Sequence, residues 1–155
     1  MAEPHGGVTP PLAVVFAAVG FFALLIGGYG VVSLLSDTDV VTARGAGNAP
    51  GVLGAAAATV AFTLMVWAAV RAPRPTFPRT VGITVVTVAA GVLGLFLGAV
   101  AVGATVADAF GIAADYAVSP FLWVLVAAAF IASWGAIALV RTRSGRPRWP
   151  WENER

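Results

Sequence analysis

The chain has 155 residues, of which 59% are hydrophobic and only 10% are charged, with a mean hydropathy of +0.92 and a formal net charge of +2. Soluble domains usually carry about a quarter charged residues, so this composition excludes an ordinary soluble protein and predicts an integral membrane protein. Cysteine is absent, which excludes disulfides, thiol catalysis, iron–sulfur clusters and a lipid-modified cysteine anchor.

Four apolar runs without Asp, Glu, Lys or Arg predict four membrane-spanning helices, because each reaches the roughly 20 residues that cross a bilayer. The runs cover residues 11–35, 51–70, 80–107 and 120–140. The loops and tails outside them are shorter than the roughly 50 residues of a small soluble domain. We therefore expect one all-α membrane domain over residues 1–155, a four-helix bundle made of two transmembrane hairpins, with residues 141–155 as a basic tail.

The first run, 11–35, lacks a basic start and is longer than the apolar core of a secretory signal peptide. We expect an uncleaved helix, although residues 41–43 (Val-Thr-Ala) resemble a cleavage site and leave processing as the alternative. Residues 27–30 (Gly-Gly-Tyr-Gly) form a glycine cluster. Since the cluster lies within hydrocarbon and no strand precedes it, a kink or a close helix contact is favoured over a phosphate-binding loop.

The second run, 51–70, begins with a small-residue patch at 54–59 and ends near Trp67 and Arg71. An aromatic residue followed by a cation is typical of the level at which lipid head groups begin. The connector at 72–79 contains three prolines, and proline cannot continue a helix because it lacks the amide donor. We therefore expect the connector to separate the second helix from the third.

The third run, 80–107, carries small residues at alternating steps of three and four, the spacing that keeps them on one face of a helix. Small residues allow membrane helices to approach closely. The members of this stripe are Thr84, Thr87, Gly91, Gly94, Gly98, Ala101 and Thr105. We expect a helix-packing surface here, and the sequence leaves open whether the 120–140 helix or a helix of another protein covers it.

A short polar and aromatic loop is expected at 108–116, between the third and fourth runs. The fourth run begins at Pro120, which suits the first turn of a helix. Ala128, Ala132 and Ala136 recur at four-residue spacing and form a second small-residue face. This face is the intramolecular candidate for contact with the stripe.

Arginine predicts the orientation of the chain in the membrane. Three arginines lie in the second loop and five in the C-terminal tail, whereas the first and third loops hold aspartates and only Arg44. Arginine in short loops stays on the cytoplasmic side, so we expect both termini in the cytoplasm, in a bacterial plasma membrane. The residues expected at the membrane interface are Arg71, Arg74, Arg79, Arg141, Arg143, Arg146, Arg148, Trp149 and Trp151.

The basic tail is interpreted as a membrane anchor, because each basic residue near an anionic surface contributes about 1 kcal/mol and tryptophan settles at the interface. Docking to a cytoplasmic partner is the alternative, and nucleic acid is not expected as a partner. Four aspartates fall in the predicted outer loops: Asp37, Asp39, Asp108 and Asp115. Oxygen-rich loops can hold a hard cation, but the spacing is not specific, so we assign neither a metal site nor a cofactor.

Enzymatic activity is not expected. The chain has one histidine, His5, and no cysteine or lysine, so the common catalytic dyads and triads cannot be built. No span holds a charged residue of the kind that couples transport to ions or protons. Two functions remain: a structural or accessory protein that binds other helices or its own copies, and an oligomeric pore or carrier, holin-like, lined by the stripe.

A further pattern combines Tyr29-Gly30, residues 33–40 (Ser-Leu-Leu-Ser-Asp-Thr-Asp-Val), a proline-rich arginine loop and the ending Arg-Pro-Arg-Trp-Pro-Trp at 146–151. In this layout the chain resembles small uncharacterised four-span membrane proteins of high-GC Gram-positive (actinobacterial) bacteria. The resemblance implies a multi-pass membrane protein and no particular activity. The chain differs from the small multidrug exporters, which have four spans as well, because it lacks their intramembrane glutamate.

Overall fold

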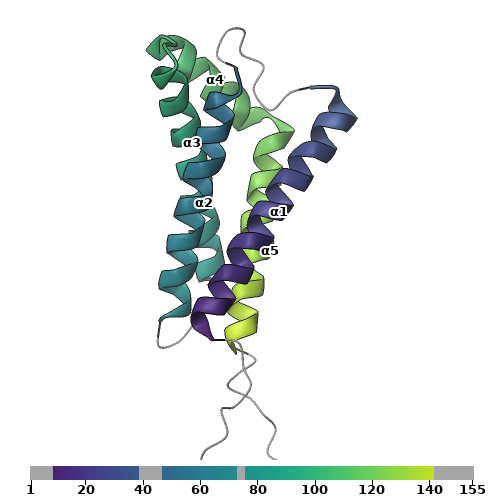
Figure 1. The fold of residues 1–155 in the computed structure, drawn as a ribbon, viewed down its shortest axis with the longest axis vertical. Helices are drawn as coiled ribbons and strands as arrows, with labels where there is room; N and C mark the ends of the chain where they lie inside the picture. Colours follow the sequence, from purple (N-terminus) through teal and green to yellow (C-terminus); the bar gives the residue numbers. More distant parts are fainter. Residues whose placement is uncertain (1–8, 39–46, 73–75, 142–155) are drawn as a thin grey trace, which may run out of the picture.

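A computed structural model describes residues 9–38, 47–72 and 76–141, and these residues form five helices (Figure 1). The helices are α1 (Pro10–Ser36), α2 (Ala49–Val70), α3 (Arg79–Ala101), α4 (Val106–Val118) and α5 (Pro120–Arg141). All except α4 are long and apolar enough to cross a membrane, with mean hydropathies between 1.9 and 2.4. The predicted all-α class with four long apolar helices in a bundle is confirmed, and the chain is a multi-pass membrane protein.

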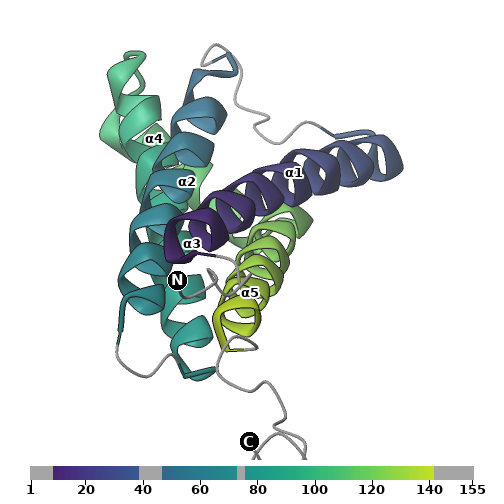
Figure 2. The same ribbon diagram turned by 60° about the horizontal axis from the view of Figure 1, so that its bottom comes forward.

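Helices α2 and α3 run side by side, α1 lies obliquely against α5, and α4 lies at one end of the bundle (Figures 1 and 2). We call this the α4 end; α1 ends there, and α2 begins there. The opposite end, where α1 begins and α5 ends, is called the tail end. The most extensive contact joins α2 to α3, and the next joins α1 to α5. The closest pair therefore links the two hairpins expected from the sequence rather than the helices within one hairpin.

Prolines and left-handed residues account for several helix ends. Pro10 and Pro11 occupy the first positions of α1, where the missing amide costs no helical hydrogen bond. Asp37 ends the same helix with φ 50 and ψ 36, a left-handed conformation that aspartate tolerates better than most residues. Gly103 has a φ of 94, which favours glycine and turns the chain between α3 and α4.

The expectation of a helix over 80–107 followed by a loop at 108–116 is wrong. Helix α3 ends at Ala101, and residues 106–118 form the separate helix α4. Thr105 is the N-cap of α4: its hydroxyl accepts a hydrogen bond from the Asp108 amide at 3.2 Å and donates one to the Asp108 carboxylate at 2.6 Å. Such a cap satisfies an amide that the first helical turn leaves free.

The centre of the bundle is aromatic and aliphatic. The rings of Phe21 and Phe62 stack with their centroids 4.3 Å apart, and both side chains are fully buried. Leu25 of α1 and Leu125 of α5 extend this core. Beyond Leu25, however, α1 has no buried residue, and Figures 1 and 2 show it diverging from α2 toward the α4 end.

Candidate functional site

The predicted small-residue stripe of α3 lies against α2 of the same chain. Five of its members are buried: Thr84, Thr87, Gly91, Gly94 and Gly98. A Cβ atom added to Gly94 would lie 2.5 Å from the Cβ of Ala57 and 2.9 Å from the carbonyl oxygen of Leu53. A Cβ on Gly98 would lie 2.9 Å from the Cα of Pro50. Only glycine permits such an approach of two backbones.

The surface opposite this stripe belongs mainly to a helix that the sequence did not offer as a candidate. Those candidates are the 120–140 helix and a helix of another protein. Helix α2 makes the closest contact, through the patch that begins at Gly54, and the 120–140 helix also meets the stripe, where a Cβ on Gly91 would lie 3.0 Å from the Leu125 side chain. Two predicted members do not take part in it. Ala101 is the exposed last residue of α3, and Thr105 lies outside that helix as the cap of α4. Ala128, Ala132 and Ala136 are buried on α5, the helix that contacts α1 most and α3 next.

The threonines of α3 show no polar path in the described part of the chain. The Thr84 hydroxyl donates to the Thr80 carbonyl oxygen of its own helix at 2.9 Å, a common use of threonine in membrane helices. The hydroxyls of Thr80 and Thr87 are buried and have no hydrogen-bond partner among the described residues. These side chains fill the interior of the bundle.

Aromatic and basic side chains gather at the tail end. The Arg71 guanidinium lies 4.1 Å from the ring centroid of Trp67, and the rings of Phe77 and Trp134 stack at 6.0 Å. Arg79 begins α3 at the same end. Such groups are typical of a membrane–water interface. Arg141 closes α5, and the other residues predicted at the interface lie outside the described residues: Arg74, Arg143, Arg146, Arg148, Trp149 and Trp151.

The aspartates of the predicted outer loops have separate structural positions. Asp37 ends α1, while Asp108 and Asp115 lie on exposed positions of α4. Asp39 and His5 lie outside the described residues. Within residues 9–38, 47–72 and 76–141, no three acidic or histidine side chains form a group that could hold a metal ion.

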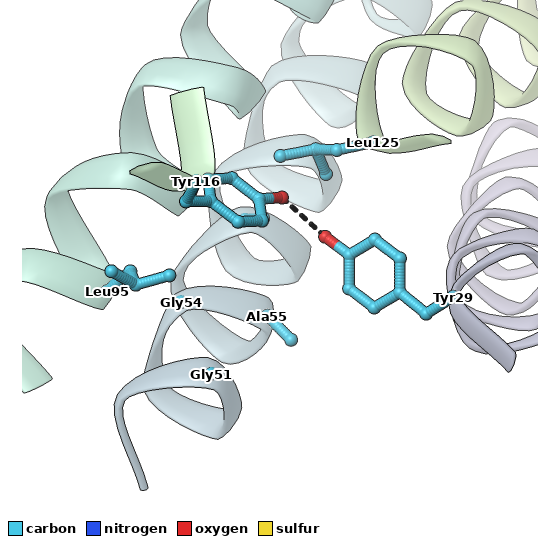
Figure 3. Close-up of a pocket in the computed structure, with 9 residues that line it drawn as sticks. Tyr29, Gly51, Gly54, Ala55, Leu95, Tyr116 and Leu125 are labelled. Atoms are coloured by element: carbon cyan, nitrogen blue, oxygen red, sulfur yellow. Dashed lines mark hydrogen bonds between the residues drawn. The ribbon is translucent and has the colours of Figure 1, made fainter. Parts of the chain in front are cut away.

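The most distinctive polar feature is a pair of tyrosines near the α4 end, drawn in Figure 3. The hydroxyls of Tyr29 on α1 and Tyr116 on α4 lie 2.6 Å apart and share a hydrogen bond in which either group can be the donor. These are the only two tyrosines of the chain. The ring of Tyr29 also meets the ring of Phe121 edge-on, with centroids 5.7 Å apart.

A small cavity lies beside the tyrosine pair. Its volume is about 10 Å³, counted as the space open to the centre of a water-sized sphere, which is about the minimum that holds one water molecule. Besides the two tyrosines, its walls are Gly51, Gly54, Ala55, Ala58, Gly91, Leu95 and Leu125. Two hydroxyls carry two protons and their mutual bond uses one, so the site offers one further donor and suits a water rather than a larger substrate.

Burial raises the pKa of Tyr116 above the ordinary tyrosine value of 10.0, and the hydrogen bond with Tyr29 lowers it in part. Burial disfavours the charged phenolate, so this hydroxyl stays protonated near neutral pH. Tyr116 therefore takes part in the pair as a neutral hydrogen-bonding group.

The comparison with protein families covers nearly the whole chain. A model of a family of unknown function, DUF6121, matches residues 11–155. The chain belongs to the DUF6121 family. A search of the curated proteins and a search of the solved structures each give no match. Membership of DUF6121, a family of unknown function, assigns no activity to the chain.

Sequence reasoning missed the tyrosine pair of this DUF6121 chain. The sequence predicts Tyr29 in a glycine-rich helix and Tyr116 in a loop, and 87 positions separate them. One local signal was available: Thr105 and Asp108 stand three residues apart before an apolar-periodic segment, the pattern of a helix N-terminus. That signal places Tyr116 on a helix but does not indicate its partner.

Proposed function

We propose that this DUF6121 chain is a small accessory membrane protein, without enzymatic activity, that binds another transmembrane helix through an outward face of α1. We call this surface the open α1 face. Its members share one side of the helix and are small: Gly20, Ala23, Gly27 and Gly30. The observation that carries the proposal is that a Cβ added to any of these three glycines would meet no atom within 4 Å.

Glycine within a helix costs roughly 0.5–1 kcal/mol relative to alanine. On α3 this cost is offset by the close contact with α2, in which Gly94 and Gly98 have no room for a side chain. The glycines of the open α1 face have no comparable contact in the described chain. In a bilayer, a small-residue face is favourable where a second helix can approach it, so a partner helix accounts for these residues.

The alternative of a pore or carrier lined by the α3 stripe has weaker support. Gly94 and Gly98 of the stripe face α2, and Gly91 lies against both α2 and Leu125 of α5, so such a path would require these helices to move away from α3. The proposal of a non-enzymatic role is supported by the scarcity of catalytic residue types, with one histidine and no cysteine or lysine in the sequence.

The proposal is tested by photo-crosslinking in the native membrane. A photoreactive residue is introduced at Ala23, which is exposed on the open α1 face. We expect an adduct with a membrane protein, either another protein or a second copy of this chain, and we expect Gly27→Leu to abolish it. The matched control is Gly135→Leu on α5, where added atoms also meet open space; it should leave the adduct unchanged.

If no adduct with a membrane protein forms at Ala23, or if the adduct persists in Gly27→Leu, the proposal that the chain binds a partner helix through the open α1 face is contradicted. Solute flux into liposomes that contain only this chain would instead support the pore.

We further infer that both termini face the cytoplasm of a bacterial plasma membrane, supported by Arg71 and Arg79 at the tail end. Reporter fusions at the C-terminus and within residues 102–105 test that orientation.

A further inference from the structure

We propose that the hydrogen bond between Tyr29 and Tyr116 is a latch that fixes the outer part of α1, and that the glycines at 27, 28 and 30 form the hinge about which this part swings when the bond breaks. The outer part is defined as residues 31–36, which follow the hinge and Tyr29. This inference does not rest on the proposed function, because it concerns the position of α1 rather than what binds its open face.

The outer part of α1 has little other support. The last buried residue of the helix is Leu25, and of the residues that follow, only Gly28, Tyr29, Val32 and Ser33 are even half-buried. Leu34 and Leu35 are 86% and 83% exposed. Tyr29 and Val32 pack against the bundle core but are only partly buried. Since packing contacts are the main force between helices in a bilayer, this segment depends on its specific bonds more than the inner part of α1 does.

The tyrosine bond is the specific bond that ties α1 to another helix at the base of this segment. Among the side-chain hydrogen bonds formed between described residues, all others join groups at most five positions apart along the chain. The backbones of α1 and α4 make no direct contact. The two tyrosine side chains point toward each other from α1 and α4 and meet through their hydroxyls (Figure 3).

A hinge lies directly beneath the latch. A Cβ atom on Gly28 would collide with the Val124 side chain of α5, whereas Cβ atoms on Gly27 and Gly30 would meet open space. Gly28 thus marks a close approach of α1 to α5, just before Tyr29 meets Phe121 of the same helix. Glycines weaken a helix locally and are found at helix bends, so bending is expected at this point once the restraint at Tyr29 is lost.

Movement of the outer part would uncover the floor of the cavity. That floor includes Gly51, Gly54 and Ala55 at the start of α2. Because these residues have small side chains, they would not block an opening toward the bilayer between α1 and α2. The latch therefore controls lateral access to the bundle at the α4 end.

Electron–electron spin distances in lipid nanodiscs test the latch. The chain has no cysteine, so the only spin labels are those placed at Leu34→Cys and Val52→Cys, both exposed, on α1 and α2. Tyr29→Phe removes one hydroxyl and keeps the ring against Phe121. We expect a second, longer-distance population that the parent lacks, and the same result for Tyr116→Phe.

Two controls make the result specific. Ser36→Ala removes a hydroxyl whose bonds reach only the Val32 carbonyl and Thr38, so it should leave the distance distribution unchanged. Labels at Leu12→Cys and Leu64→Cys, toward the tail end, should report no change in either tyrosine variant. An unchanged 34–52 distribution in both tyrosine variants overturns the latch, and an equal change at 12–64 overturns it as well, because the whole bundle would then have loosened.

The hinge has a separate test in the Tyr29→Phe background. Gly27→Ala and Gly30→Ala together stiffen the helix without steric conflict, because both Cβ positions are open. We expect them to reduce the longer-distance population at least twofold. If the population does not fall, the glycines are not the hinge.

Discussion

Two small-residue surfaces of this chain have opposite environments. The α3 stripe meets α2 so closely that a Cβ on Gly94 would lie 2.9 Å from a carbonyl oxygen, whereas a Cβ on Gly27 of α1 would meet nothing within 4 Å. Both surfaces consist of glycines and other small residues at helical spacing. The difference lies in the opposing surface: Gly54 and Ala57 of α2 are themselves small, so the two backbones can approach each other.

The comparison teaches that small residues permit close contact but do not bring it about. Where two small faces oppose each other, as on α2 and α3, packing is continuous along the helix pair. Where one small face meets no other helix of the chain, as beyond Leu25 on α1, the helix depends on single bonds such as the one between Tyr29 and Tyr116. The first region is therefore expected to be rigid and the second adjustable.

The largest expected effect comes from making the same substitution on both surfaces. Gly94→Leu places four carbon atoms where Ala57 and the Leu53 carbonyl leave no space, and overpacking against backbone should lower the free energy of unfolding by about 3 kcal/mol. Gly27→Leu should not lower it and should raise it by roughly 0.5–1 kcal/mol, because the added atoms enter lipid and the cost of a glycine within the helix is removed. Reversible unfolding in bicelles, followed by steric trapping, measures both values.

A third variant separates burial from position on α3. Gly82→Leu lies on the same helix as Gly94 but at an exposed site with open space, and it should behave like Gly27→Leu. Equal stability of the Gly94 and Gly82 variants would show that α2 and α3 do not depend on their close approach.

The spans could be read from the sequence because hydrocarbon imposes a uniform requirement on each residue that faces it, so long apolar runs such as 120–140 are sufficient evidence. The burial of Gly91, Gly94 and Gly98 follows the helical spacing in the same way. Their partner could not be read, because α2, α5 and a foreign helix all offer small residues, and the choice depends on how three helices pack together. Tyr29 and Tyr116 lie 87 positions apart, and no local pattern links them.

The second prediction concerns the inner half of α1, which should become loosely held as well when its packing against α2 is weakened. Phe62→Ala removes the ring that stacks on Phe21 at 4.3 Å, where both side chains are fully buried. Lipid is as apolar as the core, so the loss is one of contacts and of the cavity left behind, and we expect about 2 kcal/mol. Unlike the tyrosine variants, Phe62→Ala should broaden the spin distance between positions 12 and 64.

The matched control is Phe130→Ala on α5, whose ring is 47% exposed. It should leave the 12–64 distance unchanged and cost less than half as much stability. A narrow 12–64 distribution in Phe62→Ala would mean that α5 alone positions the inner half of α1, and the contrast between the two halves of the helix would then need another cause.

The smallest effect concerns α4, the helix that carries the other half of the tyrosine pair. Thr105→Ala removes both hydrogen bonds to Asp108, at 2.6 Å from the hydroxyl to the carboxylate and at 3.2 Å from the amide to the hydroxyl. Loss of an N-cap costs about 1 kcal/mol. Because local opening governs amide exchange, deuterium uptake in residues 106–112 should become about five times faster, since about 1.4 kcal/mol corresponds to tenfold.

Thr63→Ala is the control for loss of a hydroxyl alone, since that group bonds only to the Thr59 carbonyl of its own helix at 2.8 Å. It should not change amide exchange in α4.

The far end of α4 tests the latch from the other side. Tyr116 lies ten residues beyond the first helical residue and is held by Tyr29, so exchange near 114–118 should respond to Tyr29→Phe more than to Thr105→Ala. If Thr105→Ala accelerates deuterium uptake equally at both ends of α4, the helix opens as one unit. The Thr105 cap would then also support the bond between Tyr116 and Tyr29 that holds α1.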